Sequence, residues 1–190
     1  MKTFETTGKA TIEVFFNAPI PKEIKVFHNG DLYFFRNFKT PQQRIKFNIA
    51  HAGKFAINCN CDDLKVLPIV IHPLEVQLPA PDRNLVKPFK VVLNPSLVGT
   101  PARNFTKKGI IEVSPKFKTY PFCIRMFILY HERGHFLYRD EELADTWAAK
   151  NFIADGYNNS SAFYALKNVL NFDSQKNKDR LKHLFKNLHR

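Results

Sequence analysis

The chain has 190 residues, enough for one ordinary domain or two small ones. Its hydrophobic content of 44% and its 19 Phe exclude a disordered or fibrous protein and predict a packed core. No run of about 18 apolar residues is present to span a bilayer, and residues 1–5 lack the apolar core of a signal peptide. We therefore expect a soluble cytoplasmic protein without a membrane partner.

The net charge of +12 is concentrated in the second part of the chain. Residues 1–76 carry 10 basic and 7 acidic side chains, whereas residues 77–190 carry 19 and 10. Such an excess can attract nucleic acid, because Lys and Arg release counterions from phosphate. No helix-turn-helix, RNP or zinc-finger pattern accompanies the charge. The sequence therefore favours a solvated basic surface, with a nucleic acid, a virion or an anionic substrate as the alternative partner.

Short apolar runs that alternate with polar residues fill the first third of the chain, separated by turn signals such as Asn29-Gly30-Asp31. The runs lie at residues 10–16, 24–28, 32–35, 45–49, 54–57 and 67–71. Runs of this length and spacing are typical of antiparallel strands. The pattern predicts a small β-sandwich or barrel over residues 1–76, a module that would dock or bind a partner.

Prolines at 73, 79 and 81 interrupt the alternation and place a boundary near residues 73–85. Two extended runs follow, at 89–93 and 109–114, joined by a polar, basic loop. The remainder reads as helical, so the sequence predicts an α+β protein whose second domain, residues 77–190, is mainly helical with a short sheet.

Four helices are expected. Pro121 suits the first turn of a helix that runs to about Tyr138. Asp140 can cap a second helix that ends near Gly156, and the segment 159–161 opens a third.

The fourth helix carries an apolar stripe of Leu181, Leu184, Phe185 and Leu188. Its basic residues are Lys176, Lys178, Arg180, Lys182 and Lys186. The pattern favours a packed terminal helix with a solvent-facing basic side, and a helix on a membrane surface is the alternative.

One motif carries clear chemistry, the sequence His131-Glu132-Arg133-Gly134-His135. Residues four apart lie above one another on a helix, so His131 and His135 can present two imidazoles to one metal ion. Glu132 points beside that face and can reach a water held by the metal. The other five histidines have no partner at ligand spacing along the sequence.

A catalytic zinc needs a third protein ligand and an open position for water. Glu141 and Asp145 follow shortly after the motif and are four residues apart, hence on one helical face. Glu141 could bind the zinc while Asp145 accepts the free ring N–H of a liganding histidine, which fixes the orientation of that ring.

At this point the chain resembles the zincin metallopeptidases of the gluzincin-like type, and the small His-Glu-x-Gly-His proteins of bacteria and their phages. The likeness covers roughly residues 105–157, on His131, Glu132, Gly134, His135, Glu141, Ala144, Asp145 and Ala148. It implies a minimal zincin domain that holds Zn²⁺. It also implies His131, His135 and Glu141 as ligands, Glu132 as general base, and Asp145 as hydrogen-bond partner of a ligand.

One departure concerns the third ligand. Only five residues separate His135 from Glu141, fewer than in thermolysin-like enzymes and as many as in metzincins, where His or Asp would be the ligand. Metzincins have Gly where this chain has Tyr138. Asp145, Glu142 and a distant residue therefore stay open as alternatives to Glu141.

The resemblance implies a zinc-dependent peptidase that hydrolyses peptide bonds with a metal-activated water. The run 109–114 would be the edge strand that aligns the substrate. Tyr138 and Tyr157 are candidates for donating to the oxyanion. The competing hypothesis is a structural or interaction protein, for example a virion component of a phage, that keeps the zincin fold, with or without zinc, and without required proteolysis. In either case the β module could attach the chain to a larger assembly.

Overall fold

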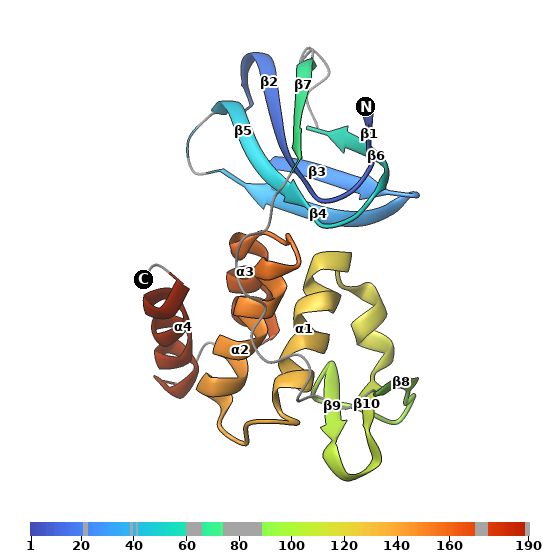
Figure 1. The fold of residues 1–190 in the computed structure, drawn as a ribbon, viewed down its shortest axis with the longest axis vertical. Coiled ribbons are helices and arrows are strands. Elements are labelled where there is room, and N and C mark those ends of the chain that lie inside the picture. The colour runs from blue at the N-terminus through green and yellow to red at the C-terminus, as the bar shows by residue number, and fades with distance from the viewer. Residues whose placement is uncertain are drawn as a thin grey trace. The chain divides into compact units, whose positions relative to one another are not determined.

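The structure, a computed structural model, describes residues 1–20, 23–38, 40, 42–59, 66–73, 89–169 and 175–188 (Figure 1). The chain divides into two compact units, Met1–Gln77 with Gly156–Asn158, and Leu78–Asp155 with Asn159–Arg190. Strands make up the first unit, and the helices follow in the second, so the predicted α+β class is confirmed. The predicted boundary between residues 76 and 77 lies outside the described residues and stays a prediction.

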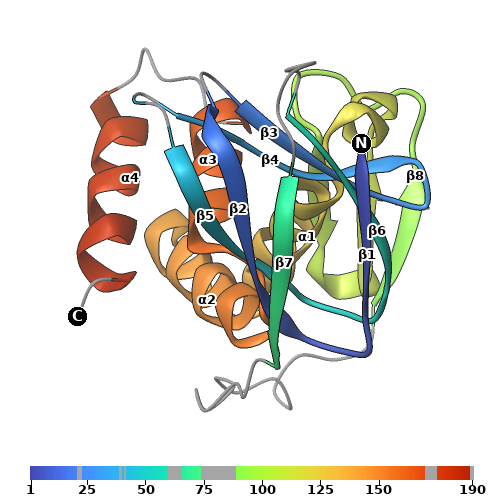
Figure 2. The ribbon, with the colours of Figure 1, turned by 90° about the horizontal axis from the view of Figure 1, so that it is seen from above.

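The first unit is built from antiparallel strands. They are β1 (Lys2–Thr6), β2 (Ala10–Ile20), β3 (Glu23–His28), β4 (Asp31–Asn37), β5 (Gln42–Ile49), β6 (Gly53–Asn58) and β7 (Val66–Pro73). One sheet has the order β1-β6-β3-β4 and the other β5-β2-β7, whose three strands lie side by side in Figure 2. All six predicted runs are strands. The pattern misses β1, which has Phe4 as its only apolar residue and pairs with β6 alone among the described strands.

Aromatic rings pack between these two sheets. The ring of Phe47 on β5 stacks on Phe34 of β4 at 5.6 Å between centroids and meets Phe4 of β1 edge-on at 6.5 Å. On β2 the side chains of Ile12 and Val14 are fully buried, as the two-residue period of a strand requires. The predicted β-sandwich is thus present.

The turn between β3 and β4 confirms the hairpin signal in the sequence. Asn29 and Gly30 have φ angles of 50° and 85°. Two positive φ angles in succession are the requirement of the type I′ turn that matches the twist of paired strands.

A small three-stranded sheet opens the described part of the second unit. Its strands are β8 (Lys90–Leu93), β9 (Ala102–Phe105) and β10 (Ile110–Val113), in the order β8-β10-β9. Short 3₁₀ turns lie at Thr106–Lys108 and Pro115–Thr119. The sequence predicts β8 and β10 but treats β9 as loop. The expectation that residues 109–114 form an edge strand is wrong, because β10 is paired with β8 on one side and β9 on the other.

The second unit continues with α1 (Phe122–Gly134), α2 (Glu141–Ala154), α3 (Asn159–Val169) and α4 (Gln175–Leu188). α1 ends four residues before its predicted end, because the N–H groups of Phe136 and Leu137 bond carbonyls only three residues back, those of Arg133 and Gly134. Asp140 caps α2 as predicted, accepting a hydrogen bond from Leu143 N at 2.9 Å. Among the described residues, no helix combines the length and the apolarity needed to cross a membrane.

Side-chain burial on the terminal helix α4 differs from the prediction. Leu184 of the predicted stripe is fully buried, but the Phe185 side chain is 56% exposed. Arg180, expected on the solvent-facing basic side, is only 5% exposed. The buried face of α4 therefore includes a charged residue.

Candidate metal centre

The end of α1 brings two imidazoles together. The His135 N–H donates to the carbonyl of His131 at 3.2 Å, so the turn that joins them is still helical although α1 formally ends at Gly134. The Nε2 atoms of the two rings lie 3.1 Å apart. The four-residue spacing thus places both nitrogens at one point.

Gly134 allows α1 and α2 to approach closely at this point. A Cβ atom on Gly134 would lie 2.9 Å from the backbone oxygen of Ala144 and 3.2 Å from its Cα. Real Cβ atoms essentially never come that near to backbone, so any side chain here would push the helices apart. The glycine in the motif therefore serves the packing of α2 against the histidines.

The start of α2 places the carboxylate of Glu141 beside the two histidines. Asp140 fixes the start of the helix, and Glu141 is the first helical residue. Its Oε2 atom lies 3.5 Å from Nε2 of His131 and 3.6 Å from Nε2 of His135. Among the described residues these three form a group whose ligand atoms all lie within 4.8 Å of one another and could hold a metal ion.

The spacing of the three atoms fits a tetrahedral ion. Nitrogen and oxygen ligands about 2.0–2.1 Å from such an ion are about 3.3–3.4 Å from one another. The observed separations are 3.1, 3.5 and 3.6 Å.

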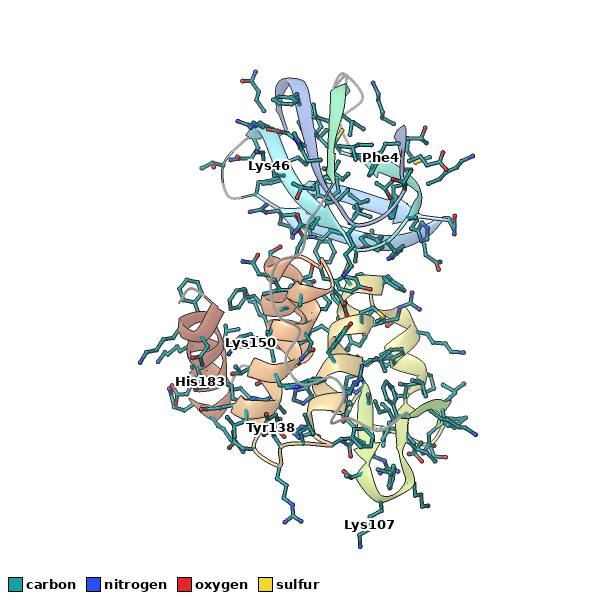
Figure 3. All side chains as sticks on the ribbon, in the orientation of Figure 1. Phe4, Lys46, Lys107, Tyr138, Lys150 and His183 are labelled. Atoms are coloured by element: carbon teal, nitrogen blue, oxygen red, sulfur yellow. The ribbon has the colours of Figure 1, made fainter. Side chains whose placement is uncertain are left out.

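Hydrogen-bond partners set which ring nitrogens face the site. Nδ1 of His135 lies 3.0 Å from the backbone oxygen of Tyr138, the residue labelled in Figure 3. A carbonyl only accepts, so Nδ1 carries the proton and Nε2 presents a lone pair. Nδ1 of His131 similarly lies 2.8 Å from Oδ1 of Asp145. Two lone pairs 3.1 Å apart repel each other unless a proton or a metal ion lies between them, so the arrangement suits a cation.

The carboxylates of the site stay charged at neutral pH. The contact with His135 is the main cause that lowers the pKa of Glu141 to about 2, and the charge of Arg180 acts in the same direction. Burial raises the pKa of Asp145, but hydrogen bonds from His131 and Arg180 outweigh burial and hold it below its usual value. The contact with Glu141 in turn raises the pKa of His135.

Glu132 differs from the other two acids. Burial raises its pKa above the usual value, against the opposing charges of His131 and His135. Its backbone oxygen accepts a hydrogen bond of 2.7 Å from Nδ2 of Asn104 on β9. A carboxyl group with raised proton affinity beside three potential ligands suits the acceptance of a proton.

A cavity of about 340 Å³ opens at this cluster. His131, Glu132, His135 and Glu141 line it. The other walls come from residues 100–103 and from Phe127, Ile128, Ala165, Leu166 and Arg180. The potential ligands and the candidate base thus border one space that can admit another molecule.

The other sequence candidates lie elsewhere. Asp145 faces the Nδ1 side of His131, away from the shared Nε2 atoms. Glu142 points to His183 of α4, at 3.8 Å. Tyr138 contributes its backbone oxygen, and Tyr157 is buried in the segment that groups with the first unit.

Arg180 is the residue that the sequence analysis did not place in the site. Its Nε lies 2.8 Å from Oδ2 of Asp145, and its Nη2 lies 2.9 Å from Oε2 of Glu141. The contacts are between residues 35 and 39 positions apart, so no local pattern encodes them. One signal was available, because Arg180 precedes the buried Leu184 by four residues and therefore shares its face.

Comparisons of the chain with protein families, with curated proteins and with solved structures find no match. The His131, His135 and Glu141 group, with a cavity beside it, is therefore what identifies this part of the molecule as a candidate metal centre.

Proposed function

We propose that the chain is a zinc-dependent peptidase, with His131, His135 and Glu141 as ligands. Two imidazole nitrogens and one carboxylate oxygen are a donor set typical of catalytic zinc, whereas Ca²⁺ and Mg²⁺ prefer oxygen alone. Three protein ligands leave a fourth position for water or substrate. The single observation that carries the proposal is the convergence of these three ligand atoms beside Glu132 in one cavity.

The residues around the proposed ligands have separate roles in the reaction. When bound, zinc supplies Lewis acidity that lowers the pKa of water towards about 7 and polarises a carbonyl. Glu132 accepts the proton of the attacking water at its carboxylate and returns it to the leaving amine. Its raised pKa brings its proton affinity closer to that task. Asp145 and the backbone oxygen of Tyr138 keep the two imidazoles in one orientation.

Strand β9 replaces residues 109–114 as the strand that would align a substrate. Among the described strands β9 pairs only with β10, and Ala102 and Arg103 of β9 border the cavity. An extended peptide added along β9 would gain main-chain hydrogen bonds and pass the ligand group. The substrate class we propose is therefore a peptide in extended conformation.

The test combines metal analysis with a matched pair of substitutions. Zinc should co-purify in a one-to-one ratio in buffers without chelator, and the protein should cleave members of a peptide library. Glu132→Gln should retain zinc and lose at least about 100-fold in turnover, the usual contribution of a general base. Glu142→Gln is the control, because its carboxylate belongs to the same chain region but faces His183.

The outcomes separate the two functional hypotheses. Stoichiometric zinc without cleavage of any peptide, together with stable incorporation into a larger particle, would favour the structural or interaction protein. Protein that binds no zinc would contradict the peptidase and would leave only a zinc-free structural or interaction protein.

A further inference from the structure

A single guanidinium group contacts two residues of the proposed metal centre from the far end of the chain. Arg180 lies on α4, the helix on which His183 is labelled in Figure 3. Nε and Nη2 of Arg180 bind the two oxygens of Asp145 at 2.8 and 3.0 Å. Nη2 also lies 2.9 Å from Oε2 of Glu141. The two hydrogens of Nη2 are therefore shared between two different carboxylates.

The Glu141 oxygen that meets Arg180 is the same Oε2 that lies nearest to both histidines. A carboxylate oxygen has two lone pairs, so one can face Arg180 while the other faces a metal ion. Asp145 in turn contacts Nδ1 of His131 at 2.8 Å. Arg180 thus reaches one ligand directly and a second ligand through Asp145.

The contact between Arg180 and Asp145 is buried. Arg180 is 5% exposed and Asp145 is 1% exposed, and burying charges costs free energy unless their hydrogen bonds are well made. The planar fork of an arginine matches a carboxylate in two parallel bonds, which a lysine ammonium does not reproduce. A buried fork on α4 therefore fixes the rotations of the Asp145 and Glu141 side chains.

We propose that Arg180 is a positioning residue that orients Glu141 directly, and His131 through Asp145, so that α4 is an integral part of the metal centre. The inference rests on the proposed metal site and assigns a role to a residue that binds no metal itself. His135 depends on the Tyr138 backbone instead, so it keeps its orientation when Arg180 is replaced.

Metal affinity, measured by competition with a chromophoric chelator for Zn²⁺, tests this role without any assay of activity. Arg180→Met should weaken zinc binding about 10–100-fold, the usual cost of losing a partner that orients a ligand. Arg180→Lys should restore only part of the affinity, because it keeps the charge without the fork. Lys182→Met removes a cation from an exposed position of the same helix and should bind zinc as the wild type does.

Two further measurements distinguish orientation from general stability. The visible spectrum of the Co²⁺-substituted protein should change in Arg180→Met and remain unchanged in Lys182→Met, since it reports the ligand geometry. Asp145→Asn combined with Arg180→Met should cost less than the two single changes together, because Arg180 acts partly through Asp145.

The proposed function and the role of Arg180 are contradicted by different results. A wild-type protein that binds no zinc contradicts the proposed function, whereas wild-type zinc binding with equal affinity in Arg180→Met overturns the role of Arg180 alone. Should Arg180→Met fail to fold, Arg180→Lys decides, and wild-type affinity with an unchanged Co²⁺ spectrum in that variant would overturn the proposal.

Discussion

Among the described residues, two pairs of histidines lie close together, one in the first unit (the β unit) and one in the second (the helical unit). In the β unit the ring centroids of His28 and His51 are 5.0 Å apart, and in the helical unit those of His131 and His135 are 4.6 Å apart. Their surroundings differ. His28 stacks on Phe55 at 4.7 Å, and His51 meets the ring of Tyr33 edge-on at 5.3 Å. Among the described residues, only the pair in the helical unit is joined by a carboxylate in a potential ligand group.

The two environments shift histidine pKa values in opposite directions. Burial and the charge of His28 lower the pKa of His51. The contact with Glu141 raises the pKa of His135 despite its burial. Nearby imidazoles are thus common to both pairs, and only one pair belongs to a group that could hold a metal ion. A carboxylate that favours positive charge, and acceptors that turn both Nε2 atoms inward, distinguish one pair from the other.

The largest expected difference between the pairs concerns metal binding. His131→Asn removes one of three proposed ligands and should weaken Zn²⁺ binding by more than the roughly 10–100-fold cost of losing an orienting partner. His28→Asn should leave the stoichiometry and affinity for zinc unchanged, because no carboxylate completes a group around His28 in the described residues. Chelator competition measures both. Equal loss in the two variants would mean that the metal binds elsewhere.

A smaller difference, in stability, is expected between alanine substitutions at two glycines, one in each unit. Gly134→Ala would normally gain up to about 1 kcal/mol of helix propensity. The new Cβ meets the backbone of Ala144, so we expect a net loss of about 1–3 kcal/mol from overpacking. Gly8→Ala in the β unit meets no atom within 4 Å and should change stability little.

The single tryptophan makes this measurement specific to the helical unit. Trp147 lies on α2 and is 4% exposed, so its fluorescence reports the unfolding of that unit in urea. A Gly134→Ala variant as stable as the wild type would show that α1 and α2 can separate at little cost.

What the sequence could predict follows from the range of each interaction. His131, His135, Glu141 and Asp145 are placed by helical periodicity and by a cap at Asp140, all of which are local. The strands with alternating apolar residues are recognisable for the same reason. The relation of the ligand group to Arg180 depends on how α4 packs, which no local pattern specifies.

One error, and one contact that the sequence did not predict, have the same origin. Residues 102–105 read as loop because Arg103 and Asn104 dilute the apolar pattern, yet pairing with β10 makes them a strand. The sequence gives His28 and His51 no ligand spacing, since they are 23 positions apart and meet only when β3 and the turn before β6 come together. Strand β9 and the contact between His28 and His51 both depend on residues elsewhere in the sequence.

The smallest expected effect is a difference in pH dependence between the two units of the metal-free protein. The folded-state pKa of His51 lies below 6.5, so the unfolded chain binds more protons near that pH. Its contribution to the stability of the β unit should decrease as the pH falls below about 6.5. The folded-state pKa of His135 lies above 6.5. Its contribution should be complete at low pH and disappear as the pH rises through the folded-state value.

Titration of the histidine C2 protons by NMR, in the presence of a chelator, gives both pKa values directly. His51→Gln and His135→Gln assign the two resonances, and each should remove the pH dependence of its own unit. Trp147 fluorescence follows unfolding of the helical unit, while amide hydrogen exchange in β6 follows the β unit. A His51 pKa above that of His135 would contradict the account of the two environments. It would mean that burial beside Phe55 and His28 favours the imidazolium more than the carboxylate of Glu141 does.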